Sequence, residues 1–324
     1  MLIAIVTGTL AGVLMGVVLH RGQLCFHSMI TTAQRGHTDL LRGWLLGVTI
    51  AAVGLALLYS LSWSDGLNRG LAFRPVSAVI GGLLIGVGMV VARSCVSGLL
   101  FKLGSGMAGA SVGLAGWAAG ELLVRDLDVP GPTILAGGLE GTIPGVLGLP
   151  RLVVALVALV LAVAWVARSR PGPDVTRPSW QWGRVTLGIG LGVAIVGGWV
   201  LARVGDASYG PSSVGAVASV VDGSPRWWLI AFLVGIVLGA LVSARAGAGW
   251  WWRGESRGRL LGLFAGGVLF GAGGWIAGGC NIGHGLSGVA QLNASSWVVV
   301  LSISAGVWMA ARLVPDRSPS GSRS

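Results

Sequence analysis

The chain has 324 residues, of which 54% are hydrophobic and only 10% are charged. Soluble domains carry about 25% charged residues, so the composition excludes a soluble globular protein and predicts an all-α integral membrane protein in a lipid bilayer. The formal net charge is +11, and Lys102 is the only lysine. Cytoplasmic loops of membrane proteins collect arginine, so this charge gives only weak support for an anionic substrate, and we expect no nucleic-acid partner.

Apolar runs predict nine membrane spans. Residues 2–19 form the first span, which is not a cleaved signal peptide because no basic residue precedes it and no A-x-A site follows it. Residues 131–149 are interrupted by Pro and Gly, and we expect a re-entrant or surface segment there. The other spans are predicted at 43–61, 76–92, 108–124, 152–167, 185–202, 227–243, 260–277 and 297–313.

Arginines in the polar segments predict the orientation of these spans. The segments 168–184 and 245–259 contain four arginines each, so both are expected in the cytoplasm. This places the N-terminus in the periplasm and the C-terminus in the cytoplasm of a bacterial inner membrane. Residues 168–184 then link an N-terminal half, 1–167, to a C-terminal half, 185–314, and residues 315–324 are expected to be a disordered tail.

A glycine pattern precedes every cysteine: G-x-L-x-G, eight further residues and then Cys. The three copies end at Cys25, Cys95 and Cys280. Ordinary helix packing through glycines is the alternative explanation, but seven further identities relate the copies around Cys95 and Cys280. A fourth, weaker copy predicts a cysteine where the chain has Ala248, and we interpret it as degenerate.

The predicted topology makes the spans before Cys95 and Cys280 run in opposite directions, as an inverted repeat requires. The first and seventh spans are predicted to be parallel, so a single inverted repeat does not relate the two halves of the chain. Three cysteines without a CxxC pair predict neither a disulfide framework nor a thioredoxin-like site, and we expect free thiols.

Each cysteine follows the end of an apolar helix. A break at membrane depth is tolerated only where the freed backbone groups face protein or a cavity. If a short helix begins just after each cysteine, its free amides and positive end point at the thiol and favour an anion. Buried thiols keep their proton and donate weakly, which suits a site that must release its ion. We therefore predict a substrate pathway along neutral Cys25, Cys95 and Cys280, without a cofactor or a metal.

Polar side chains and glycines beside the thiols are predicted to support anion binding. The alternatives are turn chemistry for Ser and Gly, hydrogen-bonded loop imidazoles for the histidines, and small apolar fillers for the cysteines. Arg93 or Lys102 could compensate anionic charge, although we favour Lys102 as a marker of the cytoplasmic end of a span. Glu121, inside a predicted span, is a candidate proton carrier or a partner of an arginine. The supporting residues are Gly22, Gln23, His27, Arg93, Ser94, Ser97, Gly98, Lys102, Gly279, Asn281, Gly283, His284 and Ser287.

These motifs resemble the YeeE/YedE family of sulfur-compound membrane proteins, whose better-understood members take up thiosulfate. The likeness is strongest over residues 278–288, GGCNIGHGLSG, is good over 95–106, and extends to 21–26. Two departures are Ser94, where the family has glycine, and Leu99, which stands where the other copy has His284. The resemblance implies an hourglass of nine spans and short helices, three cysteines that pass an anion on by S–H hydrogen bonds, and association with small sulfur-carrier or rhodanese-like proteins.

The sequence thus predicts an importer of thiosulfate or a close sulfur oxyanion. One rival is a transporter of a selenium compound or another sulfur species, and a second is a membrane thiol enzyme or sulfurtransferase that forms a persulfide. A third rival is a soft-metal permease, because thiolate and imidazole suit copper or zinc, although CxxC pairs and Met-rich segments are missing. Its ligands would be Cys25, His27, Cys95, Cys280 and His284.

Overall fold

The computed structural model describes residues 1–168, 178–247 and 250–313, and within them the chain is helical, without a β-strand. Seven segments are long and apolar enough to cross a membrane, so the chain is a multi-pass membrane protein. All nine predicted spans fall on helices, but α6, with 15 residues, and α8, with 17, are shorter than the others. The elements are α1 Leu2–Gly22, α2 Phe26–Gln34, α3 Asp39–Tyr59, η1 Ser62–Ser64, α4 Pro75–Ala92, α5 Val96–Gly104, α6 Gly109–Leu123, α7 Ile143–Leu147, α8 Arg151–Ala167, α9 Arg184–Val204, α10 Ala216–Val221, α11 Trp227–Arg245, α12 Arg257–Ala277, η2 Gly283–Gly288 and α13 Ala294–Leu313.

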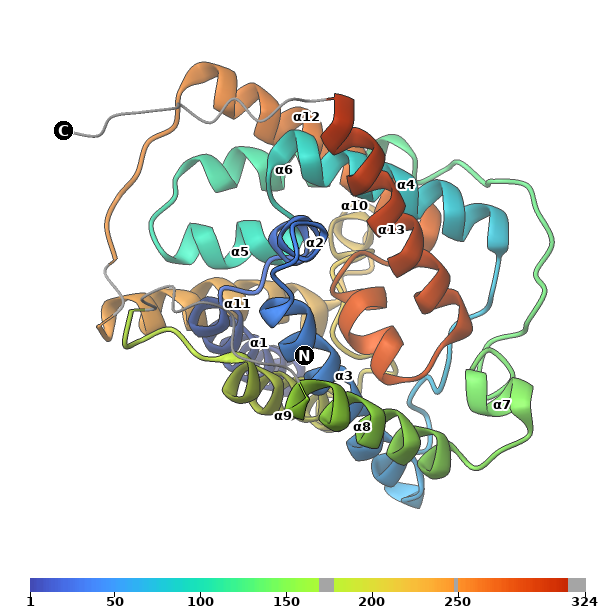
Figure 1. Ribbon diagram of the computed structural model, residues 1–324. Coiled ribbons are helices and arrows are strands. Elements are labelled where there is room, and N and C mark those ends of the chain that lie inside the picture. Colours follow the sequence, from blue (N-terminus) through green and yellow to red (C-terminus); the bar gives the residue numbers. More distant parts are fainter. Residues whose placement is uncertain (169–177, 248–249, 314–324) are drawn as a thin grey trace.

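The long helices form two groups with short helices between them (Figure 1). One group contains α4, α6, α12 and α13, and the other contains α1, α3, α8, α9 and α11. The short helix α5 packs against α6 of the first group and α11 of the second, and α2 packs against α13 and α3. Both groups draw helices from residues 1–167 and from residues 185–314, so the two parts of the sequence are interleaved in space.

Glycines of the repeat lie where α4 crosses α12. A Cβ atom on Gly81 would stand 2.5 Å from the carbonyl oxygen of Gly273, and one on Gly88 would stand 2.7 Å from that of Gly266. The early part of one helix therefore faces the late part of the other, and the two helices are antiparallel. Small residues let helix backbones approach this closely, which explains why both copies contain the same glycines.

A second crossing, between α1 and α11, uses the other two copies of the repeat. Gly12 of α1 packs directly against Gly235 of α11, while Gly8 meets Trp228 and Gly16 meets Ile236. Contacts that advance together along both helices mean that α1 and α11 are parallel. The sequence predictions for these two pairs of spans, one antiparallel and one parallel, are both confirmed.

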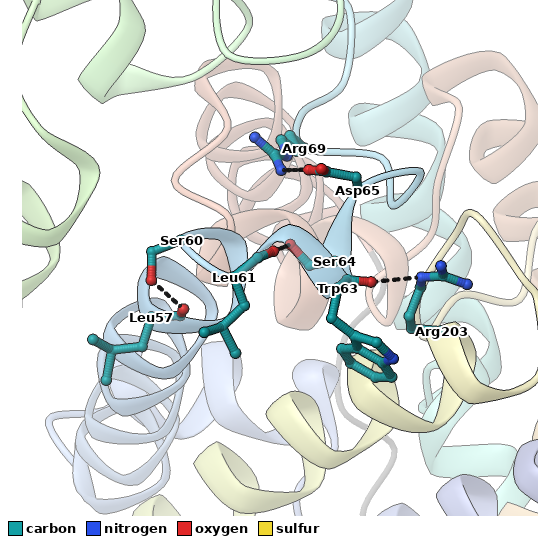
Figure 2. A network of polar contacts seen from close by, with 8 residues as sticks. All are labelled: Leu57, Ser60, Leu61, Trp63, Ser64, Asp65, Arg69 and Arg203. Carbon is teal, nitrogen blue, oxygen red and sulfur yellow. Dashed lines mark hydrogen bonds and ion pairs between the residues drawn. The ribbon is translucent and has the colours of Figure 1, made fainter.

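The segments that leave the bundle are anchored by local polar contacts. Residues 131–149 form a largely exposed segment at the surface of the bundle, and this segment contains α7. Figure 2 shows the turn after α3, where the Ser60 and Ser64 hydroxyls each donate to the backbone carbonyl three residues earlier. Arg203 of α9 donates to the carbonyl of Trp63 at 2.8 Å. This turn is therefore fixed to a neighbouring helix.

Three sequence predictions concern residues outside the described ranges. They are most of the linker 168–184, the tail 315–324, and Ala248 in the degenerate copy of the repeat.

Candidate functional site

Three helices, α1, α4 and α12, end in the same way three residues before a cysteine. The residue after each helix has a left-handed backbone, with φ of 49° at Gln23, 46° at Arg93 and 74° at Gly278. The next backbone amide then donates to the carbonyl five residues earlier, at 3.1, 3.1 and 2.9 Å, which is the Schellman ending of a helix. The fourth copy lacks this ending, because Ala246 after α11 has φ of −75°.

The predicted short helices follow two of the three cysteines. Cys25 is the N-cap of α2 and Cys95 is the N-cap of α5. After Cys280 the chain forms a turn and then the π-helix η2. Each repeat therefore brings a long helix to an end, turns the chain, and places a cysteine at the start of a new short segment.

The first two breaks meet, and their thiols touch. Cys25 Sγ lies 3.4 Å from Cys95 Sγ, and both residues are buried. The sulfur of Cys95 also accepts the backbone amides of Phe26 and Gly98, both at 3.3 Å. These amides belong to the first turns of α2 and α5, so two helix starts direct N–H groups at one sulfur. The amide of Gly98 points at the thiol just before its own helix, as predicted, whereas the amide of Phe26 points at Cys95.

A chain of hydrogen bonds continues from these thiols to the third break. Cys95 Sγ lies 3.2 Å from Ser97 Oγ, and this hydroxyl accepts from Asn281 Nδ2 at 2.8 Å. Asn281 donates to Ser97, whereas either group can be the donor in the Ser97–Cys95 contact and in the Cys95–Cys25 contact. Asn281 is fully buried, and its Oδ1 has no hydrogen-bond partner among the described residues.

The thiol of Cys280 has a partner that the sequence analysis missed. Ser213 Oγ lies 2.7 Å from Cys280 Sγ, and the backbone amide of Ile282 donates to the same sulfur at 3.2 Å. Ser213 is fully buried on the segment between α9 and α10. The only feature of the sequence that could have indicated this contact is the pair of serines after Pro211, in an otherwise apolar half of the chain. Serines at such a position are equally typical of a turn.

Glu121 of α6 fixes the segment that carries Ser213. Its Oε1 accepts the backbone amides of Gly215 at 3.0 Å and Ala218 at 3.2 Å. The residue is fully buried, and Oε2 has no hydrogen-bond partner in the described part of the chain. Glu121 therefore holds the chain just after Ser213, the residue that contacts Cys280.

Replacement of Ser213 by alanine tests whether its contact with Cys280 matters. Loss of one net hydrogen bond is worth about 1 kcal/mol, so we expect Ser213→Ala to lower the rate of substrate uptake about fivefold without loss of folded protein. Initial uptake rates in vesicles would measure the effect. The matched control is Ser208→Ala, because Ser208 is an exposed serine on the same segment; equal rates for the two variants would exclude a role for Ser213.

Of the two cationic candidates, Lys102 reaches the second break. Its Nζ donates to Ser94 Oγ at 3.1 Å. Lys102 also lies near the end of the apolar segment Pro75–Gly104, and the short helix α5 returns its side chain to the break. Arg93 is exposed at the end of α4. The Gln23 amide donates to the carbonyl of His20 at 2.7 Å, and so closes its own helix rather than facing the thiols.

His284 and Ser287 stabilise the third break. The Nε2 of His284 donates to the carbonyl of Ala277, since a carbonyl can only accept, and Nδ1 lies 2.9 Å from Ser296 Oγ. The Ser287 hydroxyl donates to the carbonyl of Pro211 at 2.6 Å. Both side chains are thus committed to contacts within the protein, and both keep the chain around Cys280 in place.

The glycines of the predicted site have different roles. A Cβ atom on Gly98 would stand 2.8 Å from Cys25 Sγ, so Gly98 lies directly among the thiols. Gly279 packs against the ring of His284, and Gly283 packs against Ser212. Gly22 instead faces Leu187 of α9, which is helix packing. His27, in the first turn of α2, is half-buried.

The predicted pathway residues therefore separate into two connected clusters. The first contains two thiols and their donors, and the second contains the third thiol, with Asn281 as the link between them. Within the described residues, no three His, Cys, Asp or Glu side chains gather as ligands of a metal ion would. The residues of the first cluster are Cys25, Phe26, Ser94, Cys95, Ser97, Gly98 and Lys102.

These features define a multi-pass membrane protein with a buried polar site at the breaks of three helices. Residues 21–309 match the family described as "Sulphur transport". The chain belongs to this family, the YeeE/YedE family that its motifs resemble, and is a transporter rather than an enzyme.

Individual relatives extend over nearly the whole chain. It is 30% identical to the "Thiosulfate transporter TsuA" of Spirochaeta thermophila, over 94% of this chain and 97% of that protein. It is 26% identical to the protein of the same name from Escherichia coli, over 96% of this chain and 94% of that protein. The "Probable transporter YedE" of Escherichia coli is similar over a shorter region, with 31% identity across 29% of this chain and 22% of that protein.

Proposed function

We propose that the chain imports thiosulfate, or a closely related sulfur oxyanion, across the inner membrane. The observation that carries this proposal is the buried chain of hydrogen bonds from Cys25 through Cys95 and Ser97 to Asn281. Every group in it can donate to an anion without carrying a charge. The two relatives named as thiosulfate transporters support the choice of substrate.

The thiols would pass the anion from one to the next. An oxygen of thiosulfate that accepts the S–H of Cys95 would replace the contact of this thiol with Cys25. The amides of Phe26 and Gly98 already donate to the sulfur of Cys95 and so favour its role as a donor. Thiols are weak hydrogen-bond donors, so the ion is held less firmly than by an arginine. Weak binding at each step lets the ion move on to the next donor.

The arrangement in the membrane would be an hourglass of nine crossings, built from the halves 1–167 and 185–314. The antiparallel pair α4 and α12 would cross the membrane side by side in opposite directions, and the N-terminus would be periplasmic and the C-terminus cytoplasmic. With 15 residues, α6 spans about 22 Å. That is less than the ~30 Å of a bilayer core, as expected for a helix beside the narrow centre of an hourglass-shaped protein.

Uptake of a dianion needs a source of energy or a sink. Movement of two negative charges inward against about 100 mV costs ~4.6 kcal/mol. At equilibrium, the concentration of the dianion inside would therefore be more than about a thousandfold lower than outside. We propose proton coupling, with Glu121 or His284 as the carrier, or rapid consumption of the ion by a small cytoplasmic sulfur-carrier or rhodanese-like protein.

Growth of a sulfur-auxotrophic host on thiosulfate, together with uptake of labelled thiosulfate into vesicles, tests the proposal. Wild-type protein should support both. The variants Cys25→Ala, Cys95→Ala and Cys280→Ala should each lose at least about tenfold in uptake, since each removes a donor to a charged group worth ~1.5–3 kcal/mol.

Serine at the same positions provides the matched comparison, because its hydroxyl is also a donor. The serine variants should retain more uptake than the alanine variants when the amounts of protein in the membrane are equal. Normal growth of all three alanine variants would contradict the relay, and no uptake by the wild type would contradict the substrate.

A further inference from the structure

The connection between α11 and α12 carries aromatic and basic side chains next to one another. Its described residues 250–253 have the sequence WWWR, while Arg245 ends α11 and Arg257 begins α12. Figure 1 shows the connection at the edge of the bundle, where it passes the turn between α5 and α6. Because it joins the ends of two helices long enough to cross a membrane, it lies at the level where the chain leaves the bilayer.

This WWWR segment, residues 250–253, has a fixed place in the structure. The backbone amide of Arg253 donates to the carbonyl of Gly106 at 2.8 Å, and the amide of Ala108 donates to the carbonyl of Arg253 at 3.1 Å. A Cβ atom on Gly106 would stand 3.4 Å from the ring of Trp250, which is half-buried. The segment is thus held against the turn that follows α5, and its exposed side chains project from a defined backbone.

Two of the tryptophans are exposed on the WWWR segment. Trp251 is 57% exposed and Trp252 is 70% exposed. Contact of such large apolar rings with water is unfavourable. Tryptophan is instead enriched at the membrane–water interface, because its ring enters the headgroup region while its N–H finds polar partners. The exposure of these rings, at the ends of two spans, therefore indicates contact with lipid headgroups.

Two arginines add uncompensated positive charge beside these rings. The guanidinium of Arg245 lies 4.7 Å from the ring centre of Trp250, and that of Arg253 lies 5.0 Å from the ring centre of Trp251. Both arginines are exposed, and neither takes part in an ion pair among the described residues. A guanidinium over an aromatic ring keeps N–H groups at its edge for an acceptor, so both arginines can bind an anionic group.

We propose that Arg245 and the WWWR segment bind the headgroup of an anionic phospholipid in the cytoplasmic leaflet. The guanidinium groups donate to the phosphate oxygens, and Trp251 and Trp252 lie against the glycerol and the upper parts of the acyl chains. In the orientation proposed above this segment faces the cytoplasm, the side whose negative surface potential attracts basic segments. Such a site binds a lipid more tightly than a soluble phosphate ester, which offers no apolar surface to the rings.

The bound lipid also holds one end of α5. The backbone hydrogen bonds of the WWWR segment go to Gly106 and Ala108, directly after α5, and the N-cap of α5 is Cys95. Loss of the lipid would loosen the end of the helix that positions this thiol. Uptake is therefore expected to depend on anionic lipid; this consequence, unlike the lipid site itself, rests on the proposed function.

Purified protein in detergent tests the lipid site, because a ligand that binds the folded state raises its melting temperature. Phosphatidylglycerol should give a saturable rise, whereas zwitterionic phosphatidylcholine and glycerol phosphate, which has no acyl chains, should give little. The double variant Arg245→Gln/Arg253→Gln should need about 25-fold more phosphatidylglycerol for the same rise, and Trp251→Ala/Trp252→Ala about tenfold more. The matched control Trp227→Ala removes a ring that is 42% exposed at the other end of α11 and should behave as wild type.

Equal rises with phosphatidylglycerol and phosphatidylcholine, or with phosphatidylglycerol and glycerol phosphate, would overturn the lipid site, as would equal rises in wild type and the arginine double variant. For the link to α5, wild-type protein should import thiosulfate faster in vesicles that contain phosphatidylglycerol than in vesicles of phosphatidylcholine alone, and the arginine double variant should be slow in both. Equal uptake by the wild type in the two kinds of vesicle would overturn that link. A wild type that binds phosphatidylglycerol and takes up no thiosulfate in either would contradict the proposed function and leave the lipid site in place.

Discussion

Gly98→Ala is expected to reduce thiosulfate uptake strongly while the helices remain assembled. The added Cβ would stand 2.7 Å from Ser94 Oγ, 2.8 Å from Cys25 Sγ and 3.3 Å from Cys95 Sγ. Because two of these distances are too short for real contacts, the thiols must separate, and the methyl group would occupy the place proposed for the anion. We expect uptake into vesicles to fall about a hundredfold, the usual effect of a misplacement near 1 Å in a site that requires exact geometry.

The control for this variant is Gly258→Ala. Gly258 lies in the first turn of α12, and a Cβ atom added there would meet no described atom within 4 Å, so this substitution should leave both uptake and melting temperature unchanged. The melting temperature of Gly98→Ala should remain close to that of wild type, because the neighbours that must move are side chains. Uptake at the wild-type rate by Gly98→Ala would show that the anion does not pass between Cys25 and Cys95.

The helix breaks could be predicted because one physical requirement is repeated in the sequence. Each copy has glycines where two helices cross, and its helix ends at a fixed distance after these glycines. The repeated pattern before Cys95 and Cys280 therefore predicted both the helix crossing and the helix break. The left-handed residue itself was not predictable at Gln23 and Arg93, since glycine is the usual choice at this position. Only Gly278 follows that preference.

Contacts between the breaks were harder to predict because they join residues far apart in the sequence. Ser213 meets Cys280 across 67 positions, and Asn281 meets Ser97 across 184. No periodic pattern marks such pairs. The contact of Lys102 with Ser94 could not be predicted for a related reason: its place after an apolar run indicates the end of a span, and the separate helix α5 brings the side chain to Ser94.

The fold also limits what a count of apolar runs can establish. The runs at 108–124 and 152–167 were predicted as spans on equal terms with the others, yet α6 and α8 are shorter than the seven long segments. Hydropathy measures how apolar a helix is, whereas the depth at which it lies depends on its neighbours. Here α6 packs closely on α12 through Gly116 and Gly120, and this packing is not visible in composition.

Glu121→Leu is expected to damage the second cluster and destabilise the protein. Leucine removes the acceptor of the Gly215 and Ala218 amides. Two buried amides without a partner cost about 2–6 kcal/mol together, so the melting temperature should fall clearly. The segment that carries Ser213 would no longer be fixed beside Cys280, and thiosulfate uptake by the protein that remains folded should fall at least about fivefold.

Glu121→Gln separates this anchoring role from proton transfer. The amide oxygen of glutamine can accept the same two backbone amides, so the melting temperature should return to near the wild-type value, but glutamine cannot carry a proton. If Glu121 couples uptake to protons, the variant will move thiosulfate down its own gradient and fail to respond to an imposed pH gradient. A normal response to the pH gradient would leave Glu121 as an anchor alone, because its carboxyl would then matter only for the amides of Gly215 and Ala218 that it accepts.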